Sequence, residues 1–194
     1  MKRSWLVLPV LLLVAAAPYR IQSVMQKALQ NERDTVAKYE ACALKASEEG
    51  YAGAAALFRA AARAEGVHAK LIMEAMGARG MTIPEPAAGH PAIGSTAENL
   101  RLAAMAEAQE RDTTYREALE AATDAKDQEL ITLFDHTRDT EVEHANLFSA
   151  ALRQLDDFKQ PKNFYVCDKC GYTTDIDLPL CALCRTREHP HEVK

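Results

Sequence analysis

Four stretches of this chain repeat apolar residues with a helical period, and each repeat is interrupted near its middle by glutamate or histidine. The stretches cover about residues 21–50, 51–76, 95–123 and 127–155. In each of them apolar or small side chains recur at steps of three or four, which places them on one face of a helix. The chain has only eight glycines and eight prolines, and many of its apolar residues are alanine, which favours close-packed helices. The pattern therefore predicts an all-α protein built on a four-helix bundle over residues 20–156.

The residues that interrupt the four stripes can all bind a metal ion. They are Glu32 in the first helix, Glu65 and His68 in the second, Glu107 and Glu110 in the third, and Glu141 and His144 in the fourth. Five buried carboxylates without cations would each cost several kcal/mol and would also repel one another. Two Glu-x-x-His pairs with carboxylates on both other helices form the arrangement of di-iron bundles. Carboxylate and imidazole donors suit iron or manganese, so the sequence predicts a site for two such ions.

The connections between the helices predict their order in space. Residues 77–94, rich in proline and glycine, are too long for a tight turn and can run the length of the bundle. The second and third helices should therefore be parallel, as in other bundles with one long crossover. Ser95 and Glu98 have the spacing of a capping box, which predicts the start of the third helix.

A segment of different composition follows the fourth helix. Residues 157–163 are polar and predict a linker, and residues 164–194 predict a small metal domain. This domain contains two Cys-x-x-Cys knuckles formed by Cys167, Cys170, Cys181 and Cys184. Such spacing is typical of a tetrahedral four-thiolate site, for which the sequence does not distinguish iron from zinc, and two disulfides are the alternative. Cys42 lies off the helical stripe and is expected to be a small buried hydrophobic residue.

The first 17 residues have the pattern of a signal peptide or N-terminal anchor. Lys2 and Arg3 precede an apolar run from Trp5 to Ala17, which is shorter than the roughly 20 residues of a membrane-spanning helix. We expect export, to the periplasm, and contact with a membrane only if this segment is retained; a cytoplasmic or membrane-anchored protein is the alternative. The formal net charge of −5 argues against nucleic acid as a partner.

The motifs together resemble those of the rubrerythrin family, from about residue 24 to residue 184. The matching segments are Asn31-Glu32 with Tyr39, Glu65-Gly-Val-His68, Ser95-Thr-Ala-Glu-Asn-Leu100 with Glu107 and Glu110, Glu141-Val-Glu-His144, and the four cysteines. The resemblance implies a ferritin-like bundle that holds two irons, followed by a rubredoxin-like or zinc-ribbon-like domain that holds one iron or zinc.

The resemblance also implies a role for each ligand. Glu65 and Glu141 would bridge the two irons. Glu32 would bind the first iron, and Glu107 with His144 the second. On reduction the first iron would exchange Glu110 for His68. Two tyrosines, Tyr39 and Tyr115, match residues next to the site in the family, although either could be an ordinary core residue.

The implied activity is the reduction of hydrogen peroxide to water, with electrons passing from an external donor through the four-cysteine iron. A head-to-tail homodimer is expected, because a metal site midway along the helices would be too far from a domain attached at the bundle end. The second knuckle, Cys181-Ala-Leu-Cys184-Arg185, departs from the family pattern and leaves the choice between iron and zinc open. The alternatives are a ferroxidase or iron-handling protein with a structural zinc site, and a metal-free structural module.

Overall fold

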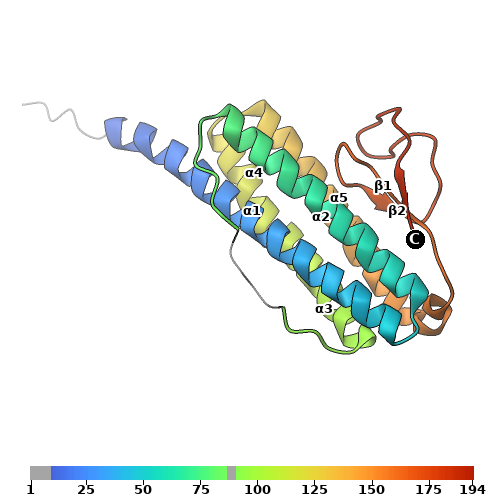
Figure 1. Cartoon of the computed structure of the whole chain (residues 1–194). Coiled ribbons are helices and arrows are strands. Elements are labelled where there is room, and N and C mark those ends of the chain that lie inside the picture. Colours follow the sequence, from blue (N-terminus) through green and yellow to red (C-terminus); the bar gives the residue numbers. More distant parts are fainter. Residues whose placement is uncertain (1–9, 87–90) are drawn as a thin grey trace, which may run out of the picture.

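The computed structural model describes residues 10–86 and 91–194, which form a four-helix bundle with a small sheet domain on its side (Figure 1). The helices are α1 (Val10–Glu48), α2 (Ala52–Ala78), α3 (Thr96–Gln109), α4 (Tyr115–Asp124) and α5 (Gln128–Arg153). A π-helical segment, η1 (Glu110–Thr114), joins α3 to α4, so these elements together form the third helix of the bundle. The predicted fold, a helical bundle followed by a four-cysteine domain, is confirmed.

Helix α1 begins earlier than the apolar stripe indicates. The stripe predicts a start near Ile21, whereas the helix begins at Val10, and its first turns extend beyond the other helices (Figure 1). The predicted signal or anchor segment over residues 1–17 lies partly outside the described residues, which leave out 1–9. Among the helices that the structure describes, none has the length and apolar character needed to cross a membrane.

Two apolar clusters fill the bundle, one toward each end. The first includes Tyr39, Phe58 and Phe148, whose ring centroids lie 5.2–5.7 Å apart. The second includes Met25 and Phe134. On each of the four helices the predicted metal ligands fall between the residues of the two clusters. The ligands are therefore held between two packed layers, which keep water away from them.

The crossover between α2 and α3 runs along α1, as its length predicts. Gln26 donates from Nε2 to the Thr82 carbonyl oxygen at 2.9 Å, and Arg33 donates to the Pro84 carbonyl oxygen at 2.7 Å. Helix α3 opens at the predicted capping box of Ser95 and Glu98. As a result α2 and α3 start at the same end of the bundle and are parallel (Figure 1).

The start of α3 is also tied to the end of α1. Thr96 donates from its backbone nitrogen and its hydroxyl to a Glu49 carboxylate oxygen, at 2.8 and 2.6 Å. These hydrogen bonds lower the pKa of Glu49 to about 2. The carboxylate therefore stays ionised and fixes the end of the crossover at neutral pH.

After α5 the chain turns back along the bundle. The segment predicted as a linker overlaps a short 3₁₀ helix, η2 (Leu155–Lys159), in which Phe158 is buried. Gly53 makes this close packing possible, because a Cβ atom there would lie 2.7 Å from the Gln160 carbonyl oxygen. The strands β1 (Phe164–Val166), β2 (Thr173–Thr174) and β3 (His191–Val193) follow, in an antiparallel sheet of order β2-β1-β3.

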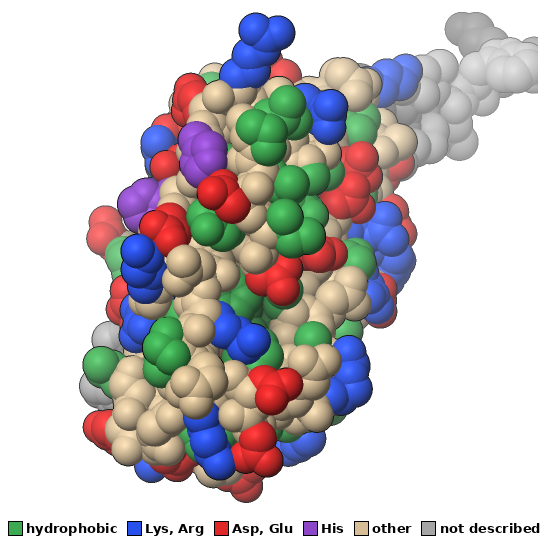
Figure 2. All heavy atoms as spheres, turned by 90° about the vertical axis from the view of Figure 1, so that its right-hand side faces the viewer, with side chains coloured by type: hydrophobic (Ala, Val, Ile, Leu, Met, Phe, Trp, Pro, Cys, Tyr) green, Lys and Arg blue, Asp and Glu red, His purple; other side chains and the backbone are tan. Residues whose placement is uncertain are grey.

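The four-cysteine domain, residues 164–194, lies against the sides of α2 and α5 (Figure 1). Arg59 donates to the Lys194 carbonyl oxygen at 2.8 Å, and Arg63 forms an ion pair with Asp168 at 2.8 Å. Figure 2 views this side of the molecule, on which acidic and basic side chains are interspersed. The domain is thus placed by specific contacts with the bundle of its own chain.

Candidate metal centre

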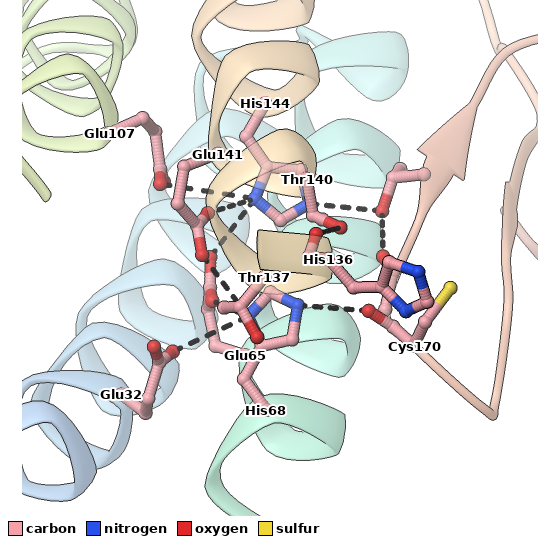
Figure 3. A network of polar contacts seen from close by, with 12 residues as sticks. Glu32, Glu65, His68, Glu107, His136, Thr137, Thr140, Glu141, His144 and Cys170 are labelled. Carbon is pink, nitrogen blue, oxygen red and sulfur yellow. Dashed lines mark hydrogen bonds and ion pairs between the residues drawn. The ribbon is translucent and has the colours of Figure 1, made fainter. Parts of the chain in front are cut away.

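Six of the seven predicted bundle ligands converge in the buried centre of the bundle (Figure 3). They form two groups, Glu32, Glu65, His68 and Glu141 in one and Glu65, Glu107, Glu141 and His144 in the other. Within each group one donor atom per residue lies within 4.8 Å of the others. Because both groups contain Glu65 and Glu141, these two carboxylates are placed to bridge a pair of metal ions.

Both histidines turn the same ring atom toward the carboxylates. The His68 Nδ1 atom lies 2.9 Å from Glu65 and 3.2 Å from Glu141. The His144 Nδ1 atom lies 3.0 Å from Glu141 and 3.1 Å from Glu65. Each imidazole can therefore bind a metal through Nδ1 while its Nε2 atom points away from the cluster.

Unpartnered buried oxygens show that these residues fit metal ions. Both oxygens of Glu32 and one oxygen each of Glu65 and Glu141 are buried without a hydrogen-bond partner among the described residues. Such groups cost several kcal/mol in a protein interior unless a cation or a donor compensates them. The four clustered glutamates carry four negative charges when ionised, which two divalent ions would balance.

The proton affinities of the cluster support the same conclusion. Burial and the charge of Glu65 raise the pKa of Glu107 to about 8. Burial acts to lower the pKa of His144, but the carboxylates of Glu65, Glu107 and Glu141 outweigh it and hold the pKa well above its usual value. Without metal the cluster thus retains protons, and metal ions would displace them on binding.

Glu110 is the one predicted bundle ligand outside both donor groups. It is half-buried at the start of η1, where it lines a cavity of about 240 Å³ with Asn31, Lys38 and Thr114. Burial and the charge of Glu107 raise its pKa well above the usual range. The charges of Glu141 and Glu65 act in the same direction, so Glu110 lies beside the cluster, and its role as a ligand stays a prediction.

The two predicted tyrosines differ in their contacts. The Tyr39 hydroxyl donates to the Glu107 carboxylate, and burial raises the Tyr39 pKa well above its usual value. Tyr39 therefore stays protonated and orients Glu107. The Tyr115 hydroxyl is buried without a hydrogen-bond partner among the described residues. The ring centroids of Tyr115 and Phe134 lie 6.3 Å apart.

The four cysteines of the appended domain form a third donor group. Their sulfurs lie within 4.8 Å of one another, and Cys167 and Cys184 are separated by 3.7 Å between their Sγ atoms, far more than the roughly 2.05 Å of a disulfide. All four are free cysteines, so the disulfide alternative is wrong for this structure. Cys42, also free, is fully buried in the apolar core, which confirms the prediction of a small buried hydrophobic residue although it lies off the helical stripe.

The four-cysteine domain contacts the metal-ligand cluster directly (Figure 3). The Cys170 carbonyl oxygen lies 3.2 Å from His68 Nε2, and the Thr173 hydroxyl lies 3.0 Å from His144 Nε2. Gly171 allows this approach, because it has a φ of +80° and any Cβ atom there would overlap the His68 ring. The distance argument for a head-to-tail dimer is therefore wrong, since the domain reaches the cluster of its own chain; the dimer itself stays a prediction.

Comparison with known proteins identifies the family. The family model described as Rubrerythrin matches residues 23–152, about two thirds of the chain. The chain belongs to the rubrerythrin family. It is 33% identical over 165 residues to a rubrerythrin of Porphyromonas gingivalis, with 81% of each chain covered. It is 29% identical over 161 residues to nigerythrin of Nitratidesulfovibrio vulgaris, covering 82% of this chain and 79% of the relative.

Solved structures of nigerythrin match a larger share of the chain than the family model does. Nigerythrin in its mixed-valence and its fully reduced, all-ferrous states superposes with a TM-score of 0.82 at 26% identity, over 89% of this chain and 86% of that one. This rubrerythrin-family chain therefore has the ligand sets of a di-iron centre and of a four-cysteine iron site, and it is an iron-binding oxidoreductase.

Two residues that the structure places at the centre were missed by sequence reasoning. Gly171 and Thr173 belong to the appended domain, and each contacts a histidine of the bundle. The only signal for Gly171 is its position after the second cysteine of a knuckle, and the sequence offers none for Thr173. Contacts between two separately predicted units do not appear in the periodicity of either.

Proposed function

We propose that this rubrerythrin-family protein reduces hydrogen peroxide to water with electrons delivered through its four-cysteine iron. The balanced reaction consumes one peroxide, two electrons and two protons and forms two water molecules. An external electron donor must supply the electrons, because each peroxide consumes two of them and the protein has to be reduced again after every cycle. When bound, the iron pair would supply the two electrons that cleave the O–O bond.

One observation carries the proposal: the four-cysteine domain touches both histidines of the bundle cluster. Cys170 provides a thiolate to its own metal site and a carbonyl oxygen to His68 Nε2 at 3.2 Å. A single hydrogen bond therefore separates the ligands of one site from those of the other. This arrangement suits electron transfer into the bundle better than storage of iron, which does not require a second site in contact with the first.

A cavity beside Glu110 supports a small polar substrate. It has a volume of about 240 Å³ and is lined mostly by polar side chains, including Asn31, Lys38 and Gln109. The apolar clusters on either side keep bulk water out of the bundle. Peroxide is small enough to enter such a cavity.

The test separates the peroxide reaction from electron delivery. Glu141→Ala removes a carboxylate shared by both donor groups, so oxidation of the anaerobically reduced protein by peroxide in a stopped-flow instrument should fall by at least about 100-fold. Asp139→Ala is the matched control, since Asp139 is an exposed acidic residue of the same helix. A Glu141→Ala protein that reacts like wild type would exclude the bundle centre as the site of reaction.

Cys170→Ser tests the delivery of electrons. This variant should retain a single oxidation of the pre-reduced bundle by peroxide but lose turnover from an external reductant. Iron and zinc analysis of the wild-type protein belongs to the same experiment. Two irons and one zinc per chain, with turnover unaffected in Cys170→Ser, would favour the iron-handling alternative with a structural zinc site.

We also propose that the protein is exported. The support is the signal-peptide pattern of Lys2 and Arg3 followed by the apolar run to Ala17. The intact mass of the protein recovered from a periplasmic fraction tests this, because cleavage near Ala16 would remove the run. Recovery of the full-length chain from the cytoplasm would contradict it.

A further inference from the structure

Thr173 connects the four-cysteine domain to a metal ligand of the bundle. It lies on β2, is fully buried, and its hydroxyl donates to the Gly171 carbonyl oxygen at 3.0 Å. A hydroxyl has one hydrogen, so its contact with His144 Nε2, also at 3.0 Å, uses the oxygen as acceptor. His144 must therefore carry a hydrogen on Nε2 and donate it to Thr173.

This hydrogen bond fixes which nitrogen of His144 can bind a metal. A neutral imidazole with its hydrogen on Nε2 has its lone pair on Nδ1. The Nδ1 atom faces the cluster, at 3.0 Å from Glu141, 3.1 Å from Glu65 and 3.8 Å from Glu107. The tautomer and the ring orientation that Thr173 selects are thus those that a metal ion between these carboxylates requires.

We propose that Thr173 is a positioning residue for the di-iron site, through which the four-cysteine domain strengthens the binding of one of the two irons. Partners of this kind, which hold the second ring nitrogen of a metal-binding histidine, typically change metal affinity by about 10- to 100-fold. The inference rests on the di-iron ligand set of the family and is independent of whether peroxide is the substrate.

The two histidines differ in how this contact can be tested. His68 donates to a backbone carbonyl, that of Cys170, which no substitution removes. His144 donates to a side chain, so the contact can be deleted with little change in shape. Thr173→Val removes the hydroxyl and keeps a β-branched side chain suited to a strand. Thr173→Ser restores the hydroxyl.

The adjacent Thr174 provides a matched control. It is also buried on β2, and its hydroxyl accepts a hydrogen bond from the backbone nitrogen of Ile176 at 3.1 Å rather than contacting a histidine. Thr174→Val therefore removes a buried hydroxyl from the same strand without touching the metal ligands. If Thr173→Val and Thr174→Val both weakened the binding of iron, the cause would be damage to the sheet and not the lost contact with His144.

The primary measurement is the affinity of the bundle for ferrous ion. One equivalent of Cd²⁺, which prefers thiolate ligands, is first bound to the four-cysteine site. The charge-transfer absorption of its bonds to sulfur verifies that this site is occupied. Anaerobic titration with Fe²⁺ against a competing chelator then follows the two bundle sites. We expect Thr173→Val to bind one of the two ions about 10- to 100-fold more weakly, with Thr173→Ser and Thr174→Val within about threefold of wild type.

A second measurement uses the wild-type protein and so does not depend on how the variant folds. In protein loaded with diamagnetic Zn²⁺, the His144 Nε2 hydrogen should give a slowly exchanging NMR signal with a close contact to Thr173. Absence of that signal would overturn the proposal, as would wild-type ferrous affinity in Thr173→Val or an equal loss in Thr174→Val.

Discussion

The ligands of the bundle site come from residues 32 to 144 and lie between two apolar clusters, whereas the four cysteines lie within residues 167–184 and are held by three short strands. In the bundle, Phe58, Phe134 and Phe148 are fully buried next to the ligand layer. In the appended domain, Phe164 and Val166 of β1 are buried in the bundle's apolar cluster, and the separate cluster around the knuckles consists of three of the cysteines themselves.

This difference separates two ways of making a metal site. The bundle has an apolar core that can form without metal, so packing brings its carboxylates together. Their burial and mutual repulsion destabilise the metal-free bundle until cations bind. The four-cysteine domain has too small a core to fold alone, so its metal contributes folding free energy directly. The two sites should therefore respond oppositely to metal removal.

The largest expected effect follows from removing all metal with a chelator under reducing conditions. The two knuckles should lose their turns, so the amides of residues 167–185 should lose protection from hydrogen exchange almost completely. The bundle should keep its helical circular dichroism, since the apolar clusters remain packed. Hydrogen exchange read by mass spectrometry separates the two regions in one sample.

Restoring one equivalent of zinc provides the control for this experiment, because it should bring back protection in the domain alone. A bundle that melts together with the domain would show that the two regions fold as one unit. The comparison between a packed site and a metal-held site would then be wrong.

An intermediate effect is expected from Gly171→Ala. The alanine would combine a left-handed backbone, which costs roughly 1–2 kcal/mol for a residue with a Cβ atom, with an overlap on His68. The domain should move off the bundle while keeping its own metal, and turnover with an external reductant should fall by at least about tenfold. Steady-state kinetics with metal analysis of the same sample would measure both.

Gly66→Ala is the matched substitution in the bundle. Gly66 lies in the middle of α2, next to Glu65, and a Cβ atom there meets nothing within 4 Å. Alanine should stabilise the helix by up to about 1 kcal/mol and leave turnover unchanged. Equal losses of turnover in the two variants would show that the contact of Gly171 with His68 does not matter.

The same contrast explains what could be predicted from the sequence. Glu32, Glu65 and Glu141 were found because a charged residue in an apolar stripe is conspicuous, and the stripe fixes its direction. Glu110 is predicted by the same stripe and lies next to the charge of Glu107, whereas the π segment that begins at this residue has no clear signal in the sequence. The knuckles were recognised from spacing, whereas their place against the bundle depends on Gly171, whose role appears only when both regions are seen together.

The polar stretch after α5 shows the same limit. Its composition predicts a linker, yet Phe158 is buried and Gly53 accommodates the chain as it turns back. That reversal places the domain beside α2 and α5 and brings Cys170 to His68. A polar composition indicates that a segment is exposed, but it does not indicate which part of the bundle the segment packs against.

The smallest expected effect compares the two knuckles with each other. The residue after each second cysteine donates its backbone N–H to the first cysteine's carbonyl oxygen, Gly171 to Cys167 at 2.8 Å and Arg185 to Cys181 at 3.2 Å. Both have left-handed φ angles, +80° for Gly171 and +60° for Arg185. Glycine adopts this conformation freely, whereas arginine is strained by roughly 1 kcal/mol.

Arg185→Gly should therefore stabilise the second knuckle by up to about 1 kcal/mol, since relief of strain exceeds the added freedom of glycine in the unfolded chain. The expected result is loss of metal to a chelator that is a few-fold slower than in wild type. Arg185→Ala separates strain from charge, because alanine keeps the strained backbone and removes the guanidinium. If Arg185→Ala slows metal loss as much as Arg185→Gly, the charge of the side chain and not the strain of the backbone destabilises the second knuckle.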